Sequence, residues 1–161
     1  MTGTSAQRNR TGGILAKHHG NCFGCGPDSP SGLHIDFRRA GDEVTGTVVF
    51  DERHQGAPGL VHGGVASAAL DEAAGAILIG HALPAVTAQL NIAFARPVPL
   101  GRPVTVRAVL DRREGRKLHI AARLELDGET AATADALFIV VEPEHFLAHG
   151  ARPGDIPALG I

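Results

Sequence analysis

The chain has 161 residues, 43% of them hydrophobic, and a formal net charge of −2 at pH 7. This length suits one compact domain, because domains typically contain ~100–150 residues. The charge creates no strong field that would attract nucleic acid or an anionic membrane. The aromatic residues, six Phe with no Trp or Tyr, are too few for a base-stacking surface. We therefore expect neither nucleic acid nor a membrane as a partner.

The N-terminal sequence shows no targeting signal. Residues 1–13 are polar and lack the apolar stretch of a secretory signal, and no apolar run reaches the ~18–20 residues that cross a bilayer. With two Cys in the chain, a secreted disulfide scaffold is not expected. We expect a cytoplasmic protein with a flexible N-terminal segment at residues 1–20.

Two strands are predicted in the first third of the chain. Residues 20–32 are rich in Gly, Pro, Asp and Ser, which indicates a loop. Residues 33–39 and 43–50 alternate apolar and polar side chains, as half-buried strands do. The pair Gly41-Asp42 between them predicts a hairpin turn.

A long helix is predicted from Gly63 to Ile79. Residues 60–77 read LVHGGVASAALDEAAGAI, so the helix is apolar almost all round, which is typical of a buried helix. Two adjacent acids, Asp71 and Glu72, are the exceptions. A curved sheet around the helix, with a second copy of the chain closing the open side, would bury it.

Four further strands are predicted after the helix, joined by hairpin connections. The turn at Asp127-Gly128 is the strongest hairpin signal in the chain. The tail, residues 143–161, is rich in Pro and Gly and is expected to be irregular. One helix with a single antiparallel sheet is an α+β design. The four strands are expected at residues 85–96, 103–113, 116–126 and 129–141.

The motif His62-Gly63-Gly64, with Asp71 inside the helix and these strands around it, resembles the hotdog-fold thioesterases. Within them it resembles the PaaI-like acyl-CoA thioesterase branch, as do the segments NCFGCGPDSPSGLHIDF and NIAFARPVPLG. The resemblance covers about residues 21–141. It implies a hotdog domain at residues 21–142, in which a single antiparallel sheet wraps around one long central helix. It also implies an acyl-CoA thioesterase that needs no cofactor and forms homodimers or dimers of dimers.

Asp71 is the candidate catalytic acid. A buried carboxylate tends to have a raised pKa, which suits a general base near neutral pH, and a carboxylate can also attack a thioester directly. The resemblance places the catalytic acid at this position. Glu72 lies about 100° further round the helix, so only one of the two acids is expected to face a given cleft. We expect Glu72 to form a salt bridge with an Arg of the facing sheet.

Gly63 is the candidate oxyanion donor. The first N–H groups of a helix lack an internal partner and lie at the positive end of its dipole, where they would stabilise charge on a thioester carbonyl. His62, Gly64 and Gln55 are assigned to substrate binding. His62 is also a candidate for holding the loop, and His54 is an alternative to Gln55 for polarising the substrate. In similar enzymes a residue at the position of Thr87 holds the acid or the attacking water.

The spacing of the motif predicts a site shared between two chains. Gly63 and Asp71 are eight residues apart, or ~12 Å along a helix, whereas one carbonyl needs both groups within ~3 Å. Two antiparallel helices side by side would bring Gly63 of one chain to Asp71 of the other.

Two other features of the sequence are the cysteines near the N-terminus and the arginines near the strand ends. Cys22 and Cys25 have the spacing of half a zinc knuckle, and His18 and His19 lie upstream. Adjacent histidines cannot easily bind one ion and there is no second Cys pair, so we expect no metal and assign the loop to packing or to the acyl pocket. Arginines near strand ends could hold the phosphates of coenzyme A, but none is singled out.

Two alternatives to the thioesterase remain. A hotdog dehydratase acting on acyl-CoA or acyl carrier protein uses a His–acid pair, and the spacing of His62 and Asp71 does not suit it. A non-catalytic acyl-CoA binding protein of this kind usually carries a DNA-binding segment, for which residues 1–20 are too short.

Overall fold

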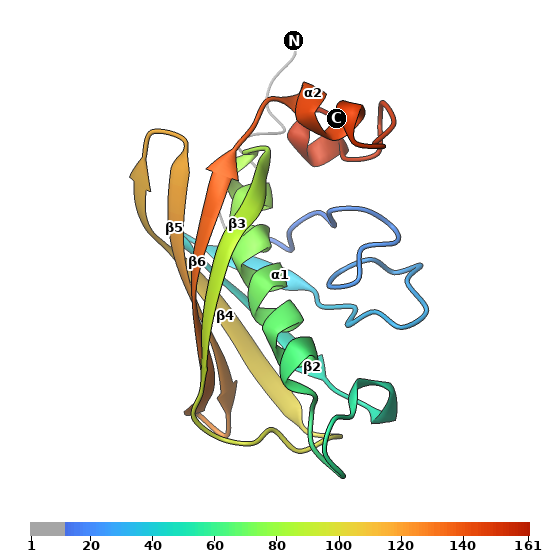
Figure 1. The fold of residues 1–161 in the computed structure, drawn as a ribbon, viewed down its shortest axis with the longest axis vertical. Coiled ribbons are helices and arrows are strands. Elements are labelled where there is room, and N and C mark those ends of the chain that lie inside the picture. Colours follow the sequence, from blue (N-terminus) through green and yellow to red (C-terminus); the bar gives the residue numbers. More distant parts are fainter. Residues whose placement is uncertain (1–11) are drawn as a thin grey trace.

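The structure, a computed structural model, describes residues 12–161. It consists of a six-stranded antiparallel sheet with one long helix, α1, packed along one face (Figure 1). The predicted α+β fold, one sheet around one central helix, is confirmed. The elements in chain order are β1 (Phe37–Ala40), β2 (Glu43–Val49), the 3-10 helix η2 (Glu52–His54), α1 (Gly63–His81), β3 (Ala85–Phe94), β4 (Pro103–Glu114), β5 (Lys117–Leu126), β6 (Glu129–Val140), α2 (Pro143–Ala148) and the 3-10 helix η3 (Pro157–Leu159).

The strand order is β1-β2-β4-β5-β6-β3, which corrects one prediction. The last four strands were expected to follow one another as hairpins, but β3 does not pair with β4. It lies at the far edge and pairs with β6, while β4 pairs with β2. The connection between β3 and β4, residues 95–102, is longer than a tight hairpin turn, so it lets the chain cross the end of the sheet.

The turn between β5 and β6 has the geometry that its sequence predicts. Asp127 has a φ of 54° and Gly128 a φ of 79°. Positive φ at both central residues is the property of the type I′ turn, which matches the twist of the two strands.

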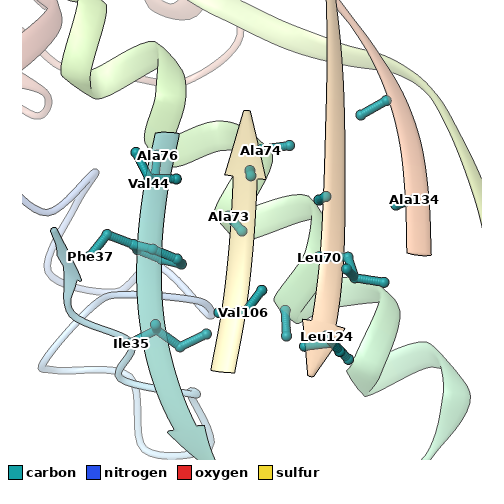
Figure 2. Packing of buried hydrophobic residues seen from close by; sticks show 14 of the residues in the cluster. Ile35, Phe37, Val44, Leu70, Ala73, Ala74, Ala76, Val106, Leu124 and Ala134 are labelled. Carbon is teal, nitrogen blue, oxygen red and sulfur yellow. The ribbon is translucent and has the colours of Figure 1, made fainter. Parts of the chain in front are cut away.

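The core lies between α1 and the inner face of the sheet. Leu70, Ala73, Ala74 and Ala76 of the helix belong to one buried cluster with Val44 of β2, Val106 of β4 and Leu124 of β5 (Figure 2). Leu70, Val106 and Leu124 are fully buried. Small side chains on the helix let it approach the strands closely, which fills the core without voids.

One side of α1 is less covered than the rest. Gly63 and Gly64 are exposed and Ser67, Ala68 and Asp71 are half-buried, whereas residues 73–80 are all buried. These positions recur every three to four residues, so they form a stripe along one side of the helix. We call this stripe the open face of α1.

By length and composition, α1 could also cross a membrane. No such run was expected from the sequence, but Asp71 and Glu72 are the only two Asp, Glu, Lys or Arg residues in this helix. More than half of the stretch is buried inside the protein. The packing in Figure 2 accounts for this apolar character, since α1 is the core helix of the sheet.

The two ends of the described chain pack against the sheet and helix. The predicted flexible segment falls partly outside the described residues, which begin at Gly12. Within it, the Leu15 N–H donates to the Phe37 carbonyl at 2.8 Å, and the Leu15 side chain is buried. The tail, expected to be irregular, instead contains α2 and η3 and ends on the buried Ile161. The domain limits at residues 21 and 142 stay a prediction.

Candidate active site

The start of α1 is held by His62. Its Nδ1 accepts a hydrogen bond from the Gly64 N–H at 2.9 Å, and its carbonyl accepts from the N–H groups of Val65 and Ala66. Among residues 12–161, the hydrogen bonds at this helix end leave the Gly63 N–H without an acceptor. His62 therefore caps the helix and engages Gly64, while the Gly63 N–H stays free at the positive end of the helix dipole.

A cavity of about 300 Å³ opens at this end of the helix. Gly63 lines it together with Phe94 and Arg96 from the end of β3 and the residues after it. Gly63 and Phe94 are in van der Waals reach, because a Cβ built on Gly63 would lie 3.5 Å from the Phe94 ring. The guanidinium of Arg96 also pairs with Glu129.

A second cavity, of about 290 Å³, contains Asp71. The Thr87 hydroxyl donates to Asp71 Oδ1 at 3.0 Å. Burial raises the pKa of the Asp71 carboxyl, and the hydrogen bond from Thr87 opposes that rise only in part. The predicted neighbours Asp71 and Thr87 thus meet, and the structure holds Asp71 as a carboxylate with a raised pKa beside an open space.

A bulge in β3 sets the position of Thr87. The register between β3 and β6 shifts between Thr87 and Gln89, so Ala88 is an extra residue on β3. Bulges re-aim neighbouring side chains and are common beside active sites. No local sequence pattern signals this bulge, because an extra residue in one strand becomes visible only against its partner strand.

The two cavities share no lining residue. Gly63 and Asp71 therefore face different spaces within one chain, as their ~12 Å spacing along the helix predicts. Each cavity holds one half of the predicted catalytic pair.

Glu72 does not form the predicted salt bridge with an arginine of the sheet. Its Oε1 lies 2.8 Å from His18 Nδ1, and its Oε2 lies 3.4 Å from Cys22 Sγ. The prediction is wrong because the loop of residues 18–26, rather than the sheet, covers this side of α1 (Figure 1).

His18, Cys22, Cys25 and Glu72 form a cluster in which one ligand atom from each lies within 4.8 Å of the others. Burial lowers the pKa of His18, but hydrogen bonds with Cys22 and Glu72 outweigh burial and raise it to about 10. Hydrogen bonding from Cys25 and His18 lowers the pKa of Cys22, whereas the same bond to Cys22, with burial, raises that of Cys25. The cluster is therefore polar and charged, although it lies against an apolar helix.

Gln55 and His54, the other predicted contacts with substrate, are held within their own loop. Gln55 Oε1 accepts from the Gly59 N–H at 2.9 Å, and His54 Nδ1 accepts from the Asp51 N–H at 3.1 Å. Neither lines the two cavities described above. Of the strand-end arginines, Arg102 and Arg112 are paired with Asp127 and Glu114, and Arg96 lines the Gly63 cavity.

The chain is similar in sequence to known thioesterases. Residues 58–133 match the model of the thioesterase superfamily. Over 92 residues the chain is 41% identical to mouse (Mus musculus) acyl-coenzyme A thioesterase THEM4. The matched region covers 56% of this chain and 40% of the mouse protein. The chain thus spans less than half the length of this curated relative.

Solved structures agree with that match. The thioesterase superfamily protein RHA08564 is 31% identical with a TM-score of 0.70, covering 76% of this chain and 63% of that protein. A phenylacetic acid degradation-related protein of Ralstonia eutropha JMP134 is 26% identical with a TM-score of 0.62, covering 67% and 86%. A hypothetical thioesterase protein of Streptococcus pneumoniae TIGR4, solved with coenzyme A, is 19% identical with a TM-score of 0.60, covering 62% and 82%.

The sheet and its central helix therefore form a hotdog fold. The segment of residues 58–133, which contains α1 and most of the sheet, resembles the thioesterase superfamily. The E. coli PaaI protein shares this fold, with 19% identity and a TM-score of 0.64, covering 68% of this chain and 81% of that protein.

Proposed function

We propose that the protein is an acyl-CoA thioesterase, which hydrolyses a thioester to a free acid and coenzyme A. The observation that carries this proposal is the Asp71 carboxylate, positioned by the Thr87 hydroxyl at the wall of a cavity and given a raised pKa by burial. The curated relative is named as an acyl-coenzyme A thioesterase, and the Streptococcus structure of this fold holds coenzyme A; both support this substrate class.

Hydrolysis needs an attacking oxygen and a donor for the carbonyl oxygen. Asp71 can take a proton from a water that attacks the carbonyl carbon, or can attack that carbon itself to form a mixed anhydride, which water then hydrolyses to the free acid and the Asp71 carboxylate. The Gly63 N–H then stabilises the negative charge that develops on the carbonyl oxygen. The C–S bond breaks, and the coenzyme A sulfur leaves as a thiolate that takes up a proton.

The two halves of the site come together in a homodimer. The open face of α1 and the free edge of β3 lie next to each other, and Phe94 on that edge is 57% exposed. A second chain packed antiparallel along this surface covers both. It places its own Gly63 beside Asp71, which gives two sites per dimer. A dimer of dimers would repeat this arrangement.

The two cavities suit different parts of an acyl-CoA substrate, one polar and one apolar. Arg96 lines the Gly63 cavity and suits the phosphates of coenzyme A. The Asp71 cavity is lined by Leu78 and Phe138 and by Phe146 and Leu159 of the tail. These apolar side chains suit an acyl or aryl group. We retain the cytoplasm as the proposed location, and neither nucleic acid nor a membrane as a partner.

The experiment is a panel of acyl-CoA substrates of different lengths, including aryl-acetyl groups, with release of free thiol as the readout. Asp71→Asn should lower turnover by about 10²–10⁴-fold, while circular dichroism shows an unchanged fold. The matched control is Asp111→Asn, at an exposed acid paired with Arg112 on the sheet, which should retain wild-type turnover. Release of no thiol from any substrate, or full activity of Asp71→Asn, would contradict the proposal.

A further inference from the structure

We propose that His18, Cys22, Cys25 and Glu72 bind one Zn²⁺ ion, which joins the loop of residues 18–26 to α1. The proposal does not depend on the proposed function, although His18, Cys22 and Glu72 also line the cavity that contains Asp71. Each residue offers one ligand atom, and the four atoms lie within 4.8 Å of one another. The loop supplies three ligands and the helix supplies the fourth.

The distances within the cluster suit a tetrahedral ion. His18 Nδ1 lies 3.3 Å from Cys25 Sγ and 2.8 Å from Glu72 Oε1, and Cys22 Sγ lies 3.4 Å from Glu72 Oε2. Zn²⁺ binds S at about 2.3 Å and N or O at about 2.0 Å, so tetrahedral ligands are separated by roughly 3.3–3.8 Å. The cluster therefore needs movements of a few tenths of an ångström to about 1 Å, within the reach of side-chain rotation.

A backbone N–H group is directed at the sulfur of Cys25. The His18 N–H donates to Cys25 Sγ at 3.3 Å. Such bonds stabilise thiolates, which are the form of Cys that binds metals. The His18 backbone therefore supports the Cys25 sulfur while the His18 ring offers a ligand to the same site.

The loop is shaped to pass directly over Glu72. A Cβ on Gly24 would overlap the carboxyl group of Glu72, and a Cβ on Gly75 would lie 3.3 Å from the His18 ring. The Gly26 N–H closes the Cys22–Cys25 turn by donating to the Cys22 carbonyl at 2.8 Å. A larger residue at position 24 would displace the Glu72 carboxylate from its place beneath the loop.

The chemistry of the four ligands favours zinc over other ions. Two thiolates and an imidazole suit Zn²⁺, whereas Ca²⁺ and Mg²⁺ prefer oxygen ligands. Four protein ligands fill a tetrahedral shell, which is typical of a structural site. Cys25 is 3% exposed and the Glu72 side chain 10%, whereas the His18 side chain is 23% exposed and Cys22 is half-buried, so one side of the ion would face the cavity of Asp71.

From the sequence we expected no metal, because no complete set of four ligands lies near Cys22 and Cys25 in the chain. Among the upstream histidines, His19 has its Nδ1 occupied by the Asn21 N–H on the surface, so His18 alone joins the two cysteines. The remaining ligand, Glu72, lies 47 residues beyond Cys25. Spacing within the loop gave no indication of it.

The test is titration of the reduced, chelator-treated protein with Co²⁺, followed by competition with Zn²⁺. A tetrahedral site with two thiolates should give thiolate-to-cobalt charge-transfer absorption and intense d–d bands at one equivalent, and Zn²⁺ should abolish both. Cys25→Ser and Glu72→Gln should each weaken Zn²⁺ binding by about 100-fold or more. The matched control, His19→Ala, should bind as the wild type does.

Three outcomes would overturn the proposal. They are the lack of a tetrahedral cobalt spectrum in the wild-type chain, equal Zn²⁺ affinity in the wild type and Cys25→Ser, and loss of Zn²⁺ binding in His19→Ala. The wild-type spectrum decides the matter even if a variant fails to fold. Because these readouts do not involve thioesters, failure of this proposal leaves the proposed function standing, and the reverse also holds.

Discussion

The Thr87 hydroxyl and the Asp71 carboxylate are joined by a hydrogen bond of 3.0 Å between the start of β3 and the middle of α1. This contact connects two segments that are 16 residues apart in the chain. It fixes the direction of the carboxylate, and so it links the bulge in β3 to the chemistry proposed for the helix.

Thr87→Val should reduce kcat about 10-fold or more, because the carboxylate loses the donor that orients it. Thr87→Ser retains the hydroxyl and should recover most of the activity. Steady-state kinetics of the two variants, with the KM measured separately, gives the comparison. If Thr87→Val and Thr87→Ser have the same kcat, the hydroxyl has no positioning role.

Glu72→Gln should lower turnover less than Asp71→Asn does. Glu72 is engaged by His18 and Cys22, whereas Asp71 is held by Thr87 at the open face of α1. Both variants should be assayed with and without added Zn²⁺, so that any loss of metal is separated from loss of the acid. A larger loss of kcat in Glu72→Gln under both conditions would identify Glu72 as the catalytic acid instead.

Leu70→Ala should lower the free energy of unfolding by about 2–5 kcal/mol, the usual cost of a cavity in a core. Leu70 is fully buried between α1 and the sheet. Urea unfolding measures the change, and Leu147→Ala on the exposed side of α2 is the control, with an expected change within about 0.5 kcal/mol. Equal effects of the two variants would argue against this core.

The sequence predicted the fold well where local patterns decide it. The continuous apolar character of residues 63–79 predicted α1 to within two residues of its observed end at His81, and Asp127-Gly128 predicted the turn that forms. The position of β3 was not predictable in this way. Alternation reports that a strand has one buried face, but it does not say which strand lies beside it.

The candidate site was predicted only in part, because local patterns again do not report contacts between distant segments of the chain. The contact of Thr87 with Asp71 agrees with what the resemblance implied, whereas the capping of α1 by His62 was not predicted. The partners of Glu72 were missed, because they depend on a loop that reaches α1 from 50 residues earlier in the chain. Such long-range contacts have no local signature.

The claim that two chains build each site is tested most directly by mixing two inactive variants. Gly63→Val places a bulky side chain at the oxyanion donor, in a position where a Cβ makes only ordinary contact with Phe94. Asp71→Asn removes the acid. Each homodimer should be inactive, while a heterodimer has one site with both defects and one site with neither.

Thioester hydrolysis by the mixture, with subunit exchange confirmed by native mass spectrometry, is the decisive measurement. Each heterodimer should regain about half of the activity of a wild-type dimer, because one of its two sites is intact. If heterodimers form and no activity returns, Gly63 and Asp71 act within one chain, and the shared site is contradicted.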